Sequence, residues 1–175
     1  WVETSDGYDA RPPALAVRAD GRVAPAMPGM VMDLNATAAG GPRASRRLYS
    51  SFDPHSTGKK ARTCESCHLS SWALGLGTGT LSLTGSRPAF RPATPAPDEP
   101  RMASDAWTHF DAEHPGVGTR VGLRSLDAKE LRRTLAVGAC VSCHKDARDP
   151  VWKDFEASKA RLAIGRTRCA FSTKG

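Results

Sequence analysis

Short runs of alternating apolar and polar residues predict β-structure in residues 1–40. Leu15–Arg18 and Val23–Ala26 flank Ala19–Gly21, a turn signal that is typical of a hairpin. Met30–Leu34 predicts another short strand. The next segment, 44–52 (ASRRLYSSF), predicts a short helix. We therefore expect a small β-rich segment that is followed by a helical turn.

The second half of the chain is more helical in pattern. Asp127 and Glu130 form a capping-box signature, and Leu131 and Leu135 follow at i, i+4 spacing, which predicts a helix that leads to Cys140. Two shorter helices are expected: one starts at Ser104 and carries Trp107, His109 and Phe110, and one starts at Asp149–Pro150 and ends at Gly165.

Glycine and proline divide the chain. Residues 72–79 hold glycines at alternate positions, which predicts tight backbone packing. Residues 87–100 contain five prolines and predict an extended linker. The predicted organisation is a β-rich lead-in with a first unit over 1–86, a linker over 87–100 and a more helical unit over 101–175.

Composition limits the hydrophobic core and the possible partners. Only 39% of the 175 residues are hydrophobic, and 16 Gly and 13 Pro interrupt them, so a bound group with a large apolar surface would enlarge the core. No apolar run is long enough to span a membrane. The net charge is +7, but the basic residues are scattered and not interleaved with aromatics, which does not favour nucleic-acid binding.

Two copies of the pattern C-x-x-C-H carry the strongest chemical signal. They are Cys64, Cys67 and His68 in one copy and Cys140, Cys143 and His144 in the other. Two thiols three positions apart can add to the two vinyl groups on one edge of haem, and the adjacent histidine can then bind the iron as proximal ligand. The sequence predicts two covalently attached c-type haems.

Three other uses of these cysteines are weaker. The pairs lie too far apart for a zinc ribbon, no βαβ unit suggests thioredoxin-like chemistry, and two structural disulfides would leave both histidines unexplained. Cys169 is the odd cysteine: a buried thiol is the simplest interpretation, and a thiolate haem ligand or an intermolecular disulfide are the alternatives.

The group opposite each proximal histidine decides between electron transfer and catalysis, because an iron with two protein ligands mainly passes electrons. His55, nine positions before Cys64, is the favoured distal ligand for one haem. His114 is favoured over His109 for the other. Met30 and Met102 are the thioether alternatives, and a Met ligand would raise the reduction potential.

Residues 52–79 and 131–152 resemble segments of exported multihaem c-type cytochromes, which often have a loop histidine before the haem motif and a Gly-rich stretch after it. The resemblance supports thioether links at the four motif cysteines, proximal ligation by His68 and His144, and bis-histidine ligation with His55. It implies a haem-dominated, multihaem cytochrome-like fold, mostly coil with short α-helices and a small β-rich N-terminal segment.

These observations together predict a dihaem electron carrier that exchanges electrons with redox protein partners. The family typically holds more haems, and the chain begins at Trp1 without an export signal, so we expect a segment or subunit of a larger periplasmic or extracellular assembly. Two alternatives stay open. One is an enzyme, a dihaem peroxidase or a sulfur-compound oxidoreductase with an open or Cys-ligated iron, and the other is a structural subunit of a redox complex.

Overall fold

The computed structural model describes residues 2–4, 7–9, 12–35, 43–51, 62–84 and 87–163. Its strands are β1 (Val2–Thr4), β2 (Gly7–Asp9), β3 (Ala14–Arg18), β4 (Val23–Asn35), β5 (Arg43–Ser51), β6 (Gly79–Thr84), β7 (Arg87–Pro92) and β8 (Leu123–Ser125). Its helices are α1 (Cys64–His68), α2 (Ala128–Val141), a 3₁₀ turn over Pro150–Trp152 and α3 (Phe155–Ala163). None of these helices is long and apolar enough to cross a membrane.

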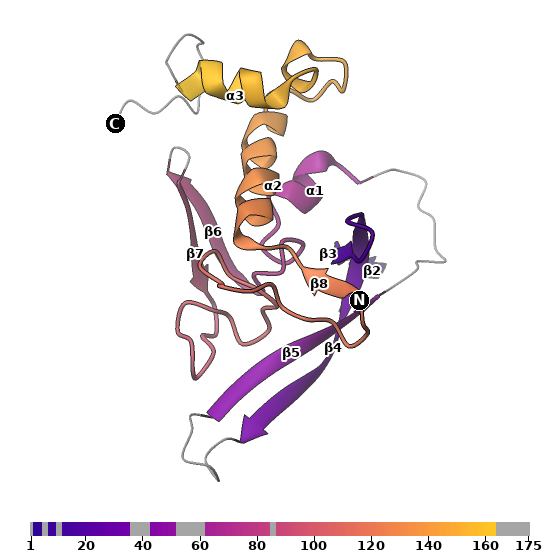
Figure 1. The fold of residues 1–175 in the computed structure, drawn as a ribbon, viewed down its shortest axis with the longest axis vertical. Coiled ribbons are helices and arrows are strands. Elements are labelled where there is room, and N and C mark those ends of the chain that lie inside the picture. The colour runs from indigo at the N-terminus through magenta and orange to yellow at the C-terminus, as the bar shows by residue number, and fades with distance from the viewer. Residues whose placement is uncertain are drawn as a thin grey trace.

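Four strands form the main sheet in the order β5-β4-β3-β8, and every neighbouring pair is antiparallel (Figure 1). The predicted hairpin is confirmed: β3 pairs with β4, Val17 lies opposite Val23, and Gly21 has the positive φ of 78° that the turn requires. The predicted strand at Met30–Leu34 is also confirmed, as the outer half of the long strand β4.

The predicted fold class is wrong. The described residues form a β-rich fold, with the four-stranded sheet, two further two-stranded hairpins and three short α-helices, rather than a mostly coil, multihaem cytochrome-like chain. The error has a physical origin: strands β5 to β8 lie outside the N-terminal segment, and cross-strand pairing orders residues that were expected to be coil or helix.

The helix predicted over 44–52 is not formed where the structure describes it, because residues 44–51 belong to β5. Tyr49 shows why, because its side chain is fully buried and stacks on Trp107 with ring centroids 4.5 Å apart. The Tyr49 hydroxyl donates to the Asp105 carbonyl at 2.9 Å, and burial raises the pKa of this phenol. Tertiary packing of this one side chain outweighs the weak helical propensity of the segment.

The helix predicted from Ser104 is also absent. Residues 104–110 run as turns and irregular backbone, and the amides of Trp107 and Thr108 both donate to the Gly75 carbonyl, at 2.8 and 3.0 Å. The backbone groups of this segment are thus used by the Gly-rich loop and are not available for helical hydrogen bonds.

The Gly-rich loop is tightly packed against other parts of the protein, in agreement with the prediction of close backbone packing. Gly75 and Gly77 have positive φ, and a Cβ on Gly77 would lie 2.9 Å from Ala103 Cβ. Leu74 and Leu76 are fully buried and pack with Val17, Leu131 and Leu135 in one core cluster. This loop therefore joins the sheet to α2.

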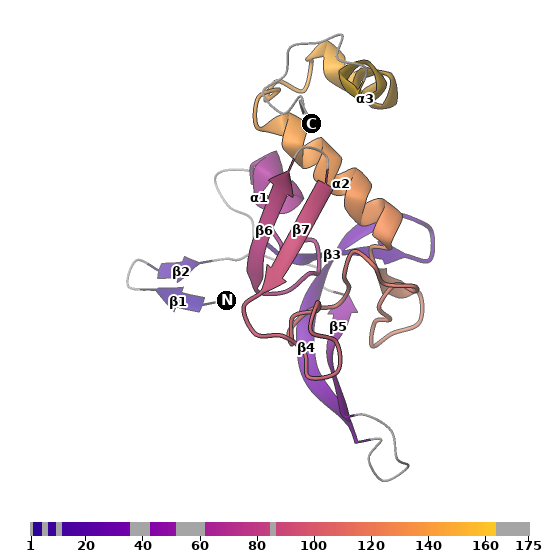
Figure 2. The same ribbon diagram turned by 90° about the vertical axis from the view of Figure 1, so that its left-hand side faces the viewer.

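The first part of the Pro-rich stretch is a strand. β6 and β7 form a hairpin in which Gly79 lies opposite Pro92 and Thr84 opposite Arg87. Leu81 and Phe90 of this hairpin pack against the Leu131–Leu135 cluster, so the hairpin lies beside α2 (Figure 2). β3 also pairs with β8, so residues on both sides of 87–100 contribute to the main sheet.

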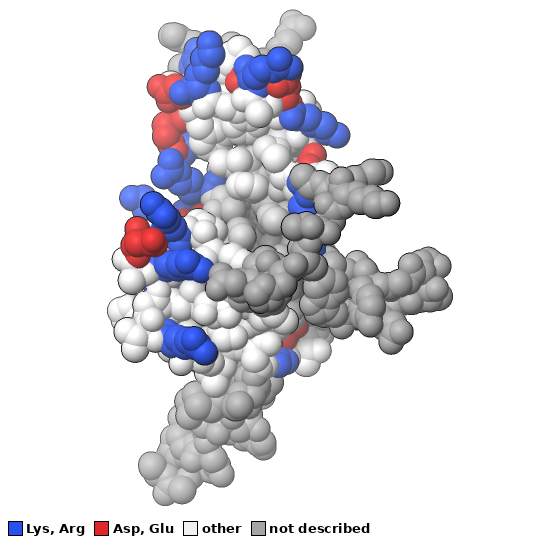
Figure 3. Space-filling model, turned by 90° about the vertical axis from the view of Figure 1, so that its right-hand side faces the viewer, with Lys and Arg blue, Asp and Glu red and all other residues white. Residues whose placement is uncertain are grey.

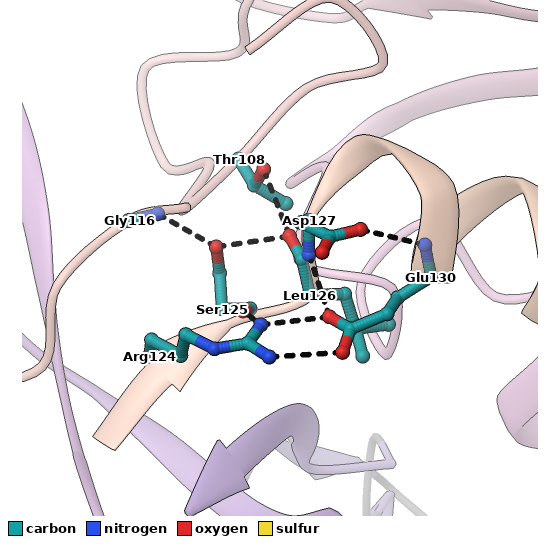
Figure 4. Close-up of polar contacts among 7 residues, drawn as sticks. All are labelled: Thr108, Gly116, Arg124, Ser125, Leu126, Asp127 and Glu130. Carbon is teal, nitrogen blue, oxygen red and sulfur yellow. Dashed lines mark hydrogen bonds and ion pairs between the residues drawn. The ribbon is translucent and has the colours of Figure 1, made fainter. Parts of the chain in front are cut away.

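Helix α2 begins with the predicted capping box. Asp127 accepts from the Glu130 amide at 2.7 Å, and the Glu130 carboxylate accepts from the Asp127 amide at 2.9 Å (Figure 4). Arg124 of β8 donates to both carboxylate oxygens of Glu130, at 2.7 and 2.9 Å, and this ion pair lowers the pKa of Glu130. The helix start is therefore fixed to the edge of the sheet.

The C-terminal helix prediction is confirmed in part. Asp149 caps through its side chain, which accepts from the Val151 amide, and Pro150 occupies the first turn as expected. The chain forms a 3₁₀ turn over Pro150–Trp152 and then a separate helix, α3, rather than one continuous helix. The predicted end at Gly165 lies outside the described residues.

Replacement of the α2 cap should measurably weaken the fold. We expect Asp127→Ala to lower the free energy of unfolding by about 1 kcal/mol, because the Glu130 amide loses its acceptor. Guanidinium denaturation would measure the loss. Asp127→Asn is the matched control, since asparagine caps equally well, and an equal loss in both variants would contradict a capping role.

Candidate haem-attachment sites

The first motif occupies a single helical turn. Thr63 caps α1 and its hydroxyl accepts from the Ser66 amide at 3.3 Å, which starts the turn at Cys64. Cys64 and Cys67 are three residues apart in this turn and His68 is four from Cys64, so all three side chains lie on one side of it. The pattern C-x-x-C-H thus becomes a compact donor set.

The backbone that follows α1 is fixed to the protein core. The Leu15 amide of β3 donates to the Ala73 carbonyl at 2.7 Å, and Leu74 and Leu76 are fully buried. The small helix α1 has no buried residue of its own, so this loop, together with α2, holds it in place.

The second motif continues helix α2. Cys140 lies in the last turn, and the amides of Cys143 and His144 both donate to its carbonyl, at 3.1 and 2.9 Å. The chain therefore keeps a helical turn through His144, beyond the end of the regular helix. Cys140, Cys143 and His144 again share one side of a turn, as in the first motif.

The motif thiols are unusually accessible. Cys64 and Cys143 are exposed, and Cys67 and Cys140 are half-buried, although cysteine is normally among the most buried residues. Cys64, Cys67 and Cys143 are free thiols, so neither motif closes into a disulfide within its own pair. Accessible thiols in both turns suit attachment of an external group.

Both motif histidines use Nδ1 for a hydrogen bond inside the protein. His68 Nδ1 lies 2.8 Å from the carbonyl oxygen of Thr134, and His144 Nδ1 lies 2.8 Å from Asp149 Oδ2. Because both partners are acceptors, each Nδ1 must carry the proton, and the neutral imidazole then has its lone pair at Nε2. A metal-binding histidine typically has this arrangement.

The two motifs are brought together by a close helix contact. α1 packs on α2, and a Cβ on Gly138 would lie 2.8 Å from both the His68 carbonyl oxygen and Leu69 Cδ2. Gly138 is one turn after Thr134, the residue that His68 contacts, so glycine allows α1 to approach where the hydrogen bond forms. Cys140 follows two residues later on the same helix.

These residues fit the haem that the motifs predict. The porphyrin supplies four nitrogens, so the protein needs only two thiols and an axial nitrogen in each site, and each turn provides them. In the described part of the chain, no group of three His, Cys, Asp or Glu side chains forms a metal-ion cluster. The described strand pairs are all antiparallel, so they contain no βαβ unit of the thioredoxin type.

The structure describes only some of the expected distal ligands. His55 and Cys169 lie outside the described residues. His114 is exposed, and His109 is half-buried, with its Nδ1 accepting from the Asp111 amide at 3.3 Å. The backbone carbonyl of Phe110 accepts from the Arg132 guanidinium at 2.9 Å. The loop that carries His109 therefore lies beside the first turns of α2, at the end opposite to Cys140 (Figure 1).

The two methionine alternatives differ in position. Met102 is 7% exposed and packs with Ala96, Ala103 and Ala106, which is the environment of a core residue. Met30 lies in β4, at the bulge that follows Pro28. The structure does not bring Met102 and either motif into one cluster.

Three residues with a role at these sites were not predicted from the sequence. Thr134 acts through its backbone, and Gly138 acts through its missing side chain, so no residue pattern identifies them. The sequence identified Asp149 only as a helix cap. Its position five residues after His144 could have indicated that its carboxylate reaches the imidazole.

Comparison of the chain with family models, with curated proteins and with solved structures gives no significant match. The interpretation of the two sites therefore depends on their residues and geometry.

The contact at Gly138 can be tested by adding one methyl group. Alanine in place of glycine normally stabilises a helix by about 1 kcal/mol, but here the new Cβ would overlap α1, and we expect a net loss of about 1–2 kcal/mol in the free energy of unfolding. Guanidinium denaturation of Gly138→Ala measures this. Thr134→Ala is the control, because it keeps the carbonyl that His68 uses, and stabilisation by Gly138→Ala would contradict the contact.

Proposed function

We propose that this chain is a dihaem c-type cytochrome, or the dihaem segment of a larger multihaem one, which transfers electrons between redox partners outside the cytoplasm. The observation that carries the proposal is the repeated donor set. Two separate helical turns each combine one exposed and one half-buried thiol with a histidine whose Nδ1 is hydrogen-bonded, which leaves the lone pair of the neutral ring at Nε2. A single motif would be weaker evidence than this repetition.

The chain's own residues would attach and orient the cofactor. Each motif thiol would add across a vinyl C=C bond of haem, with sulfur bonding to one carbon and the hydrogen going to the other, so that the addition would need neither oxidant nor reductant. His68 and His144 would each provide an imidazole nitrogen to the iron. When bound, haem supplies an iron that accepts and releases one electron. Thr134 and Asp149 hold the two imidazole rings in orientation.

The contact between α1 and α2 favours electron exchange between the two haems. His68 is hydrogen-bonded to the backbone carbonyl of Thr134 in α2. Cys140 lies six residues after Thr134 in α2, which corresponds to a rise of about 9 Å along the helix. Cofactors attached at these points would be neighbours, and electron transfer between neighbouring cofactors is fast. This proximity supports a carrier with two linked haems.

The proposed partners are other redox proteins, including further cytochrome subunits. On the face drawn in Figure 3, Lys and Arg side chains are dispersed, and near α3 several lie beside Asp or Glu. Lys159 and Arg133 are both paired with Glu156. This mixed surface, with a net charge of +7, suits an acidic protein partner better than nucleic acid. We propose a periplasmic or extracellular location, where c-type cytochromes of this type are exported.

Haem content tests the proposal directly. We expect the protein, produced with a haem-attachment system, to carry two covalent haems, as measured by its mass and its pyridine haemochrome spectrum. The double variants Cys64→Ala/Cys67→Ala and Cys140→Ala/Cys143→Ala should each retain one, because each removes one pair of thiols. A colourless protein with the mass of the bare polypeptide would refute the proposal.

Spin state tests the distal ligands and separates a carrier from an enzyme. We expect electron paramagnetic resonance of the oxidised protein to show two low-spin haems, with His55→Ala and His114→Ala each converting one haem to high spin. His109→Ala is the control and should leave both low-spin. A high-spin haem in the unmodified protein, or cyanide binding to one haem, would favour the peroxidase or sulfur-oxidising alternative.

A further inference from the structure

The two motif histidines have chemically different partners. The acceptor of His68 is a backbone carbonyl, and in a helix the carbonyl of Thr134 also accepts from the amide four residues later, that of Gly138. The acceptor of His144 is the side-chain carboxylate of Asp149, and the Oδ2–Nδ1 distance is 2.8 Å. One ring therefore faces a neutral and shared acceptor, and the other faces an anionic acceptor.

The carboxylate is held in this position by the fold. Asp149 Oδ1 accepts from the Val151 amide at 3.0 Å, which leaves Oδ2 directed at His144. The ring of Trp152 meets the His144 ring edge-on, with centroids 6.4 Å apart, and its Nε1 donates to the Asp146 carbonyl. The turn over residues 146–152 thus fixes the carboxylate and the imidazole together.

An anionic acceptor changes the imidazole as an iron ligand. A carboxylate draws the Nδ1 proton more strongly than a carbonyl does, because a charge-assisted hydrogen bond is stronger, and this increases the basicity of Nε2. A more basic axial nitrogen stabilises the ferric state over the ferrous state and lowers the reduction potential.

We propose that Asp149 is a positioning residue that lowers the reduction potential of the haem bound by His144, and so makes the two haems of this chain unequal. The proposal depends on the dihaem function above. This difference in reduction potential would set the direction of electron transfer between the two haems. An electron would pass from the haem bound by His144, which has the lower potential, to the haem bound by His68.

The test is an optical redox titration of the haem-loaded full chain. Asp149→Asn keeps a residue that caps the turn equally well but removes the negative charge. We expect it to raise the reduction equilibrium constant of the second haem at least about tenfold, which is about 59 mV for one electron, and to leave the first haem unchanged. The Cys64→Ala/Cys67→Ala background isolates the second haem and assigns the shift.

Asp146→Asn is the matched control. Asp146 is an exposed carboxylate in the same turn and bonds Arg148 rather than His144, so its removal changes the local charge but not the hydrogen bond. We expect little shift from this variant. Equal shifts in the two variants, or no shift in Asp149→Asn, would overturn the proposal.

A second measurement does not depend on a variant. In the reduced protein, nuclear magnetic resonance should show the His144 Nδ1 proton, shifted downfield by its bond to the carboxylate and slow to exchange with water. A rapidly exchanging proton would overturn the proposal. Failure of the dihaem function itself is distinguishable, because that protein would carry no covalent haem at all, whereas here haem is present and only its potential or proton signal is unaffected.

Discussion

The placement of the two candidate sites beside each other depends on the close contact between α1 and α2. α1 is a five-residue helix with no buried residue, so it cannot be held by its own hydrophobic face. It is held where His68 bonds to the Thr134 carbonyl, next to the bare backbone of Gly138. A side chain at position 138 would push α1 away from α2, and so would move the first C-x-x-C-H motif away from the second.

The β-structure is the foundation of this contact. α2 starts at the edge of the main sheet, where Arg124 and the Asp127–Glu130 capping box fix it, and its buried face, Leu131 and Leu135, packs against the Gly-rich loop that follows α1. The sheet thus positions both ends of the contact: α2 directly, and α1 through its loop. The two C-x-x-C-H motifs are therefore supported by a β-rich core.

Some of the structure was readable from local pattern. The hairpin at residues 15–26 and the capping box at Asp127 were predicted because a turn and a cap depend on neighbouring residues. The β6–β7 hairpin was missed, although Thr80–Thr84 alternates Leu with Ser or Thr and is followed by Gly85–Ser86, a strand and turn signal that the prolines of 87–100 obscured. The helix expected over 44–52 failed because the stacking of Tyr49 on Trp107 joins residues that are far apart in the sequence.

The sequence by itself determined the two candidate donor sets, because each C-x-x-C-H motif places two thiols and an imidazole within five consecutive residues, wherever in the fold those residues lie. Tertiary structure alone decided which acceptor binds Nδ1 of each imidazole. The acceptor for His68 is a backbone carbonyl of Thr134, which is far from His68 in the sequence, and the acceptor for His144 is the Asp149 carboxylate, which the turn between them brings into reach. It also decided that the two motifs are neighbours, because the glycine at position 138 permits a close helix contact only where the fold packs α1 against it.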